Sequence, residues 1–356
     1  MPHQTAPPRT PIAVIGAGVI GRTHVDRITR NPALALAGIT DPSPAGRALA
    51  EQLGVPWFSS HSAMLDRLRP QHARLGAVVA TPNATHVPVA LDCLAHGVPA
   101  LVEKPVADSV VEAQQLVDAQ ARTGVPVLVG HHRRHNPINQ RARAILATGR
   151  LGQLVTANVM ATFLKPDAYF DVAWRREPGG GPILINLIHE IDMLRFLCGE
   201  ITSVQAASSN AVRGFAVEDT AAAVLRFASG ALGTLVLSDT ATSPWCWDFC
   251  AGEQEQYPRQ PVLSHFIAGT HGSLSLPDLA LWGYRGERSW HAELTREQTL
   301  VHRQDPYARQ MAHFGAVVEG REAPLCSALD GLRTLQATLA ITEAAQCGAA
   351  MTLPHE

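Results

Sequence analysis

Residues 12 to 129 alternate short apolar runs with longer amphipathic stretches, and this rhythm restricts the fold more than any other feature of the chain. The short runs predict strands at Ile12–Ile15, Leu36–Ile39, Ala77–Ala80, Ala100–Val102 and Val125–Val129. The stretches between them predict helices at Ile20–Arg30, Ala45–Leu53, Val87–His96 and Val110–Thr123. Strands that alternate with helices form βαβ units, whose right-handed crossovers build a parallel sheet covered on both faces. We therefore predict a doubly wound α/β domain over residues 1–131.

After residue 131 strand-like runs follow one another with few helices between them. The runs are Leu154–Phe163, Thr202–Val212, Ala221–Phe227, Ala231–Ser238, Val262–Gly269 and Ser273–Leu276. The turn Ala228–Gly230 predicts a hairpin between two of them. Helices are predicted at Ile138–Thr148, Ile183–Leu197, Tyr307–Glu319 and Ala328–Cys347. Residues 132–356 thus predict an α+β domain with a mostly antiparallel open sheet, and the final helices could pack back on the first domain. A sheet with one free apolar face predicts a homodimer or homotetramer.

Composition and charge limit the classes of binding partner that this chain is expected to have. The formal net charge of −2 favours neither a nucleic acid nor an anionic membrane surface. No run of about 20 apolar residues predicts a membrane span, and the polar start, Met1–Pro11, lacks the apolar core of a secretory signal. We therefore expect a cytoplasmic protein. The six cysteines form no C-x-x-C pair, which favours reduced thiols, with Cys246 and Cys250 the pair to inspect.

A glycine-rich turn follows the first predicted strand and opens the first helix. Gly16, Gly18 and Gly21 have the spacing G-x-G-x-x-G, with Val19 and Ile20 between the last two. The first glycine permits a tight turn, the second lets a pyrophosphate approach the backbone, and the third lets helix and strand pack closely. Asp41 ends the second strand, where a carboxylate accepts hydrogen bonds from ribose hydroxyls. This is the pattern of a Rossmann domain that prefers NAD; NADP stays open because Arg47 lies nearby.

Further motifs lie along the rest of the chain. Glu103-Lys104-Pro105 directly follows the Ala100–Val102 strand, at the edge where doubly wound sheets bind ligands. Other motifs are Thr81-Pro82-Asn83 with His86, Trp174-Arg175, Gly179–Gly181, His189–Asp192, and Pro324 before the last helix. In this combination the chain resembles the glucose–fructose oxidoreductase / inositol dehydrogenase / rhizopine catabolism (Gfo/Idh/MocA) family of oxidoreductases.

The resemblance implies an NAD(P)-dependent enzyme that transfers hydride between nicotinamide and a hydroxyl-bearing carbon of a sugar, inositol or related polyol. Lys104 would stabilise the developing alkoxide, and His189 would be the general acid–base. Because X–Pro bonds tolerate the cis form at modest cost, we hypothesise that the Lys104–Pro105 peptide is cis. The implied cofactor contacts include Thr81, Pro82, Asn83, His86, Glu103, Lys104, Trp174 and Arg175.

Besides Lys104 and His189, the expected substrate contacts are Asp192, Arg134 and Asn136. Asp192 lies three residues after His189 and shares its helix face; a metal bound there is not expected, because zinc would need further ligands. The alternative for Arg134 and Asn136 is a solvated basic turn, His131–Asn136. Many family members carry Asp four residues before the histidine, where this chain has Ile185, with Asn186 one position later.

Two alternative functions stay open. The missing Asp leaves open a catalytically silent, cofactor-binding regulator on the same fold. A glycoside-cleaving enzyme that uses NAD transiently is a second alternative, while a serine hydrolase is excluded because no G-x-S-x-G elbow occurs. The loop Pro244–Asp248 could line a sugar site, or else be a buried or subunit-interface loop.

Overall fold

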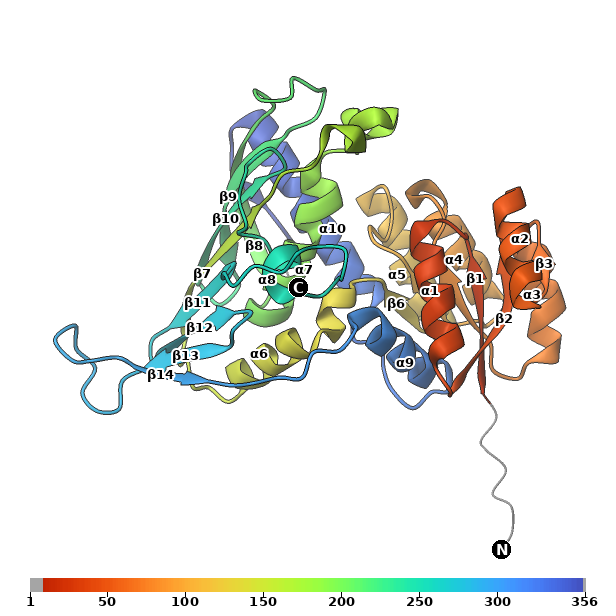
Figure 1. Cartoon of the computed structure of the whole chain (residues 1–356), viewed down its shortest axis with the longest axis horizontal. Helices are drawn as coiled ribbons and strands as arrows, with labels where there is room; N and C mark the ends of the chain where they lie inside the picture. The colour runs from red at the N-terminus through yellow and green to blue at the C-terminus, as the bar shows by residue number, and fades with distance from the viewer. Residues whose placement is uncertain (1–8, 355–356) are drawn as a thin grey trace, which may run out of the picture. The chain divides into compact units, whose positions relative to one another are not determined.

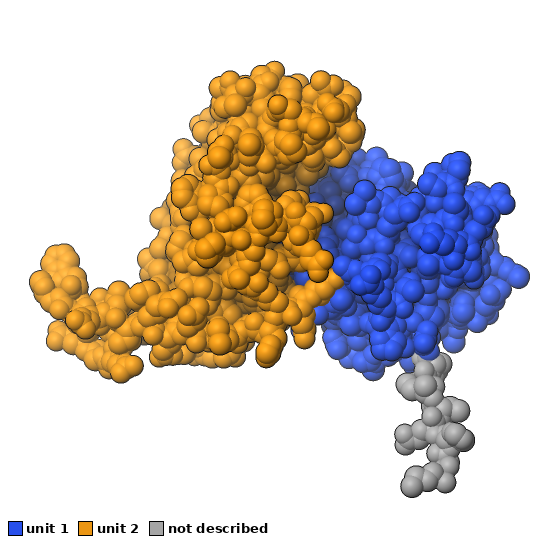
Figure 2. Space-filling view, in the orientation of Figure 1, with its two compact units in different colours: residues 1–135, 306–335 blue, residues 136–305, 336–356 orange. Residues whose placement is uncertain are grey.

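The computed structural model describes residues 9–354, so most of the polar start considered above lies outside the described residues. The chain divides into two compact units (Figure 2). Unit 1 comprises residues 1–135 and 306–335, and unit 2 comprises residues 136–305 and 336–356. Each unit is described by itself below.

Unit 1 contains a six-stranded parallel sheet in the order β3-β2-β1-β4-β5-β6. The strands are β1 (Thr10–Ile15), β2 (Leu34–Thr40), β3 (Trp57–Phe58), β4 (Gly76–Val79), β5 (Ala100–Val102) and β6 (Val127–Val129). The helices between them are α1 (Val19–Arg30), α2 (Pro44–Leu53), α3 (His61–Leu68), α4 (His86–Ala95) and α5 (Val110–Thr123). The predicted doubly wound fold is confirmed, since the strand order reverses between β1 and β4. The pattern missed β3, because a strand of two residues leaves no periodic signal, and it also missed the eight-residue helix α3.

A later segment of the chain completes unit 1. Helix α9 (Pro306–Val318) packs against α1, β1 and β4, with Phe314 fully buried. Gly76 of β4 makes this close contact feasible, because a side chain there would lie 2.5 Å from Val318. Beyond α9, the carbonyl of Cys326 accepts a hydrogen bond of 2.8 Å from the amide of Val129 in β6. Helix α10 (Ala328–Cys347) contributes residues 328–335 to unit 1 and its remainder to unit 2.

Unit 2 is built on a nine-stranded sheet in the order β14-β13-β12-β11-β7-β10-β9-β8-β15 (Figure 1). Its strands are β7 (Leu154–Thr162), β8 (Ile201–Ser209), β9 (Thr220–Phe227), β10 (Leu232–Ser238), β11 (His265–Gly269), β12 (Gly272–Leu276), β13 (Ala280–Gly283), β14 (Thr295–Gln298) and β15 (Met351–Thr352). The mostly antiparallel sheet is confirmed; among the described strands of this nine-stranded sheet, the one parallel pair joins β7 and β10. The Ala228–Gly230 hairpin is also confirmed, with Gly230 at a φ of 87°.

Two helices cover one face of this sheet. Helices α6 (Pro137–Ala147) and α7 (Ile188–Cys198) lie on the same side, as Figure 1 shows, and α7 contacts β7. Burial alternates along β9 and β10, as expected for strands with one covered face. The other face exposes apolar side chains: Val224, Leu232, Val236 and Phe266. Of the described helices, none is long and apolar enough to cross a membrane.

The structure of unit 2 differs from the predicted elements in three respects. The predicted helix Ile183–Leu197 consists of a π-helical turn, Ile183–Leu187, followed by α7. The strand predicted over Thr202–Val212 ends at Ser209, and an irregular loop follows it. Strands β13 to β15 and the short helix α8 (Trp247–Ala251) were missed, since elements of two to five residues carry little periodicity.

Candidate active site

The glycine turn between β1 and α1 has two tight positions and one open position. Gly16 has a φ of 94°, and a Cβ on it would lie 2.4 Å from the carbonyl oxygen of Ala80. A Cβ on Gly21 would lie 1.9 Å from the carbonyl oxygen of Gly16. At Gly18, in contrast, a Cβ would meet no atom within 4 Å. The turn therefore packs closely against its own unit and leaves free space in front of the helix N-terminus, which fits a dinucleotide pyrophosphate.

Asp41 lies directly after β2 and contacts the glycine turn. Its Oδ2 accepts a hydrogen bond of 2.7 Å from the amide of Ala17, and its Oδ1 accepts one of 2.8 Å from the amide of Ser43. Partial burial alone would raise the pKa of Asp41, but hydrogen bonds from Ser43 and Ala17 outweigh it and hold the pKa below its usual value. An ionised carboxylate at this place suits ribose hydroxyls and repels a 2′-phosphate.

Arg47, the nearby cation that kept NADP as a possible cofactor, contacts other side chains. Its Nε donates to Glu51 at 2.8 Å, and its guanidinium lies 5.4 Å from the centre of the Trp57 ring. These contacts engage the Arg47 guanidinium, whose positive charge had weakened the predicted preference for NAD over NADP.

Glu103 and Lys104 follow β5, and the Lys104–Pro105 peptide is cis, as hypothesised. The Glu103 carboxylate is buried: Oε1 lies 2.6 Å from Nε2 of His24 on α1, and Oε2 accepts a hydrogen bond of 3.2 Å from the Lys104 amide. Burial would raise the pKa of Glu103, but the hydrogen bond and charge of His24 hold it below its usual value. The contact between Glu103 and His24 therefore joins the loop that carries Lys104 to helix α1.

His86 links the two loops that follow β4 and β5. The ring is buried, with Nδ1 2.8 Å from the carbonyl oxygen of Pro105 and Nε2 2.9 Å from that of Thr81. The structure therefore places His86 as a tie between the Thr81–Asn83 loop and the Glu103–Pro105 loop. Sequence reasoning named His86 but missed His24, although His24 follows Gly21 by three residues and so shares its helix face.

The basic stretch after β6 is part of the protein interior. Residues His132–His135 form a buried 3₁₀ turn, so the alternative of a solvated basic turn is wrong. Arg134 donates to the carbonyl of Leu325 at 3.1 Å and lies 3.2 Å from the Asp330 carboxylate. Asn136 belongs to unit 2, where its Oδ1 accepts a hydrogen bond of 2.9 Å from the Ile138 amide and caps α6. These contacts give both residues a structural role, and their contact with substrate stays a prediction.

In unit 2, His189 lies in the first turn of α7 and is half-buried. Asp192 lies three residues on and is buried at 1% exposure. Glu190 anchors the helix, because its Oε2 lies 2.9 Å from Nε2 of His265 on β11. Before α7, the Glu218 carboxylate accepts a hydrogen bond of 2.8 Å from the Ile183 amide, which fixes the start of the π-helical turn that contains Ile185 and Asn186.

A polar cluster around the buried side chains of Lys165 and Asp239 adjoins this turn, and sequence reasoning missed it. Lys165, just after β7, donates to Oδ1 of Asn186 at 2.8 Å and lies 3.3 Å from Oδ2 of Asp239. Arg213 donates to Oδ1 of Asp239 at 3.1 Å. We call these four residues, together with Arg175, the Lys165 cluster.

Two family models match the chain. Residues 10–131 match the model described as an oxidoreductase family with an NAD-binding Rossmann fold, and residues 139–275 match the GFO/IDH/MocA C-terminal domain. Together the matches cover more than two thirds of the chain. The chain belongs to the GFO/IDH/MocA family.

Curated relatives in this family are similar over part of their length. The rhizopine catabolism protein MocA of Rhizobium meliloti is 29% identical over 58% of this chain and 63% of its own length. An inositol 2-dehydrogenase of Mycolicibacterium gilvum is 33% identical over 62% of this chain and 62% of its own length. The chain therefore spans slightly less than two thirds of these relatives.

The solved structures show that the fold extends over the whole chain. The WlbA dehydrogenase of Bordetella pertussis, solved with NADH and UDP-GlcNAcA, has a TM-score of 0.77 and 24% identity, with 98% of this chain and 100% of that chain covered. An oxidoreductase of Agrobacterium radiobacter, solved with NAD⁺ and L-tartaric acid, has a TM-score of 0.77 and 20% identity, with 97% and 98% covered.

The predicted Trp174-Arg175 segment contributes Arg175 to the cluster. Arg175 donates to the carbonyl of Tyr169 at 2.6 Å, and its guanidinium lies 4.0 Å from the centre of the Tyr169 ring. Trp174, whose side chain is half exposed, lies beside it. Both residues belong to unit 2.

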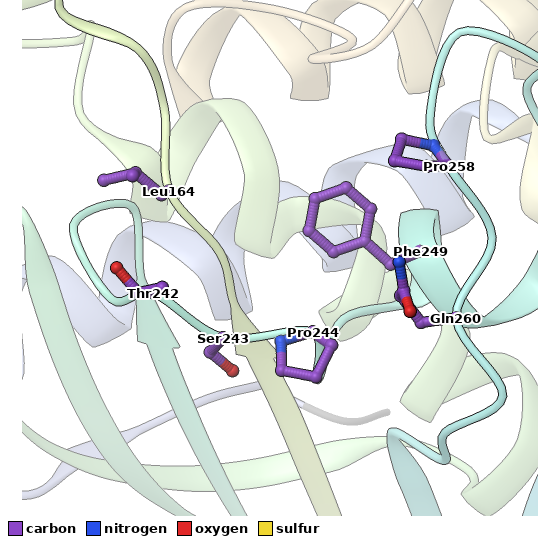
Figure 3. Close-up of a pocket in the computed structure, with 7 residues that line it drawn as sticks. All are labelled: Leu164, Thr242, Ser243, Pro244, Phe249, Pro258 and Gln260. Atoms are coloured by element: carbon purple, nitrogen blue, oxygen red, sulfur yellow. The ribbon is translucent and has the colours of Figure 1, made fainter.

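In the Pro244–Asp248 loop, Trp247 is completely buried and donates to Glu253, so its role is structural. Pro244 instead helps to line a pocket of about 320 Å³ (Figure 3). The figure shows Phe249, Pro258 and Gln260 on one side of this pocket and Leu164 and Thr242 on the other. Cys246 and Cys250 are both buried free thiols. Within residues 9–354 no group of three or more His, Cys, Asp or Glu side chains could hold a metal ion.

Proposed function

We propose that this protein is an NAD(P)-dependent oxidoreductase that transfers hydride between nicotinamide and a hydroxyl-bearing carbon of a sugar, inositol or related polyol. The observation that carries the proposal is the glycine turn of unit 1, which is tight at Gly16 and Gly21, open at Gly18, and adjoined by the ionised Asp41. Relatives named inositol 2-dehydrogenase, and a 1,5-anhydro-D-fructose reductase of Ensifer adhaerens that is 27% identical over 76% of this chain, support the substrate class.

The residues of unit 1 fit a dinucleotide. The amides around Gly18 and the α1 N-terminus would hold the pyrophosphate, Asp41 the adenosine ribose, and the Thr81–Asn83 loop the remainder. When bound, the dinucleotide supplies the hydride acceptor. Asp41 favours NAD, in agreement with the repulsion that an ionised carboxylate exerts on a 2′-phosphate.

Lys104 and His189 are proposed to act on the reacting hydroxyl. His189 removes the hydroxyl proton, and the Lys104 ammonium donates a hydrogen bond to the oxygen as negative charge develops there. The fastening of Glu103 to His24 supports this role for Lys104, because a fixed cation requires no reorganisation when the charge forms. Trp174, Arg175 and Asp192 are proposed neighbours of the substrate or cofactor. Residues 1–131 are proposed as the dinucleotide domain, and residues 132–356 as the substrate domain.

The test is Lys104→Met, assayed with a panel of sugars, inositols and hydroxy acids by NADH formation. We expect turnover to fall by about 10² to 10³-fold, the range measured for loss of one charge-stabilising donor, while the variant still binds NAD. Net NADH release also separates a dehydrogenase from a glycoside-cleaving enzyme that reuses its cofactor. Full turnover in Lys104→Met would remove the catalytic assignment, and failure of the wild-type protein to bind NAD would remove the function.

We also propose that the protein forms a homodimer or homotetramer through the open face of the unit 2 sheet. Four large apolar side chains project from adjoining strands there, and a patch of this kind on a folded protein is typical of a subunit interface. Light scattering of the purified protein tests this proposal, and a monomeric mass at micromolar concentration would contradict it.

A further inference from the structure

Strands β13 and β14 are joined by residues 284–294, which project from unit 2 as an arm (Figure 1). We call these residues the β13–β14 arm. In the middle of the arm, Trp290 is 90% exposed, whereas no other described tryptophan exceeds 48%. The Trp290 indole N–H donates to Nε2 of His291 at 2.7 Å, so the ring has a polar contact in its own chain but almost no packing. Tryptophan offers a large, rigid contact area, and it is enriched among the residues that anchor protein interfaces.

The charges of the β13–β14 arm balance one another. Its charged side chains are two arginines and two glutamates: Arg285, Arg288, Glu287 and Glu293. A segment without net charge gives neither a nucleic acid nor an anionic membrane an electrostatic advantage. It also exerts no net repulsion on an identical arm. The composition of the arm therefore favours a protein surface as its partner and is compatible with a second copy of the chain.

A pocket of about 410 Å³ lies at the base of the same arm. Its lining joins residues 268–273 of the β11–β12 hairpin to residues of β13 and the arm: Trp282, Gly283, Tyr284, Arg288 and Leu294. Arg288 fastens the two parts together, because its Nη1 donates to the carbonyl of Thr270 at 2.8 Å. Trp290 is not part of this lining. The pocket suits an indole, since it combines apolar walls with hydroxyl groups of Ser273 and Tyr284 that can accept from the indole N–H.

The pocket belongs to the open face of the unit 2 sheet. Ala268, Ser273 and Trp282 lie opposite one another across β11, β12 and β13, so their side chains point to the same face. Phe266 precedes Ala268 by two residues and is exposed on this face. The residues of the other parity are buried on the covered face: Ile267, Leu274 and Leu281. The pocket is therefore continuous with the apolar face that is proposed above as the subunit interface.

We propose that the β13–β14 arm contacts a second copy of the chain and places Trp290 in the pocket at the base of that copy's arm. A twofold axis requires a self-complementary surface, and the arm supplies both halves of one, a projecting indole and a pocket that fits it. When two such arms lie antiparallel, the middle of each faces the base of the other, and both contacts form together. The proposal rests on the proposed homo-oligomer and adds a second, specific contact to the apolar sheet face.

Association of the full chain is measured by sedimentation equilibrium over a range of protein concentrations. We expect Trp290→Ala to raise the dissociation constant at least about tenfold, because tryptophan anchors are among the costliest side chains to truncate at an interface. Trp245→Ala removes an exposed tryptophan of unit 2 outside the arm and should leave the constant unchanged. Unchanged association in Trp290→Ala would overturn the arm contact, and oligomerisation through the sheet face would stand. A wild-type protein that stays monomeric would overturn both.

A double-mutant cycle tests the place where Trp290 binds. Ser273→Phe fills the pocket from its own chain and should weaken association as Trp290→Ala does. The double variant should be no weaker than either single variant, because each substitution removes the same contact. Losses that add would locate Trp290 elsewhere on the second copy and would overturn the pocket as its site. Urea unfolding checks that Ser273→Phe folds, and Ala268→Leu, which fills the pocket from the neighbouring strand, repeats the cycle if it does not.

Discussion

In unit 1 the atoms proposed to meet the dinucleotide are mostly backbone atoms, whereas in unit 2 the polar atoms near Asn186 belong to side chains from separate segments of the chain. The glycine turn depends on close backbone approaches, such as the 1.9 Å that a Cβ on Gly21 would have from Gly16. The Lys165 cluster instead joins Lys165, Asn186, Arg213 and Asp239 through side-chain contacts.

This difference separates two kinds of recognition. A backbone cradle tolerates few substitutions, because nearly any side chain at its tight positions collides with main-chain atoms. A side-chain cluster can change its donors and charges through single substitutions without disturbing the sheet beneath it. The cofactor site is therefore shared readily across a fold, while the substrate site can differ from one member to the next.

The largest expected effect concerns the buried contact of unit 1. His24→Leu leaves the Glu103 carboxylate buried without its side-chain partner, so we expect the free energy of unfolding to fall by about 3–5 kcal/mol. Urea unfolding measures this loss. In unit 2, Lys165→Met should cost less, because Asp239 keeps its hydrogen bond to Arg213.

A surface histidine provides the control for this comparison. His61 pairs with Asp92 at 2.7 Å, but both side chains are partly exposed. His61→Leu should therefore change stability by less than about 1 kcal/mol. Equal losses in His24→Leu and His61→Leu would show that burial of Glu103 does not matter.

A smaller effect is expected from two alanine substitutions in the glycine turn. Gly21→Ala forces a Cβ against the Gly16 carbonyl and should destabilise the fold by about 1–3 kcal/mol. Gly18→Ala meets open space, so its melting temperature should stay unchanged while NAD affinity falls by about tenfold, since the methyl group occupies pyrophosphate space. Thermal melts and NAD titration measure both, with Gly286→Ala, also in open space, as the control. Unchanged NAD affinity in Gly18→Ala would contradict the cradle.

The smallest effect is an opposite response of the units to acid. The folded-state pKa of Glu103 is lowered, so its stabilising contribution is present above its ordinary pKa and is lost as the pH falls through the folded value. The folded-state pKa of Glu218 is raised, so its ionisation costs stability at neutral pH and this cost disappears as the pH falls. Hydrogen exchange between about pH 6 and pH 3.5, corrected for intrinsic rates, should show β5 losing protection before β9. If β5 and β9 lost protection at the same pH, the predicted opposite effects of Glu103 and Glu218 on stability would be wrong.

The sequence predicted the parts of the site that depend on neighbouring residues. Gly16, Gly18, Gly21 and Asp41 lie on consecutive elements of one βαβ unit, so spacing alone places them together. The Lys165 cluster could not be predicted in this way, because Lys165 and Asp239 meet only through the register of β7 beside β10. The rarity of lysine was a usable signal, since it singles out Lys165 without naming its partners.

The interrupted course of unit 1 has a consequence for synthesis of the chain. Residues 136–305 are inserted between the β6 end of unit 1 and α9, so α9 leaves the ribosome only after all of them. Until then the face of β1 and β4 that Phe314 covers stays exposed on the nascent polypeptide. Fragments that stop before residue 306 keep this apolar face bare, which makes them candidates for chaperone capture or aggregation.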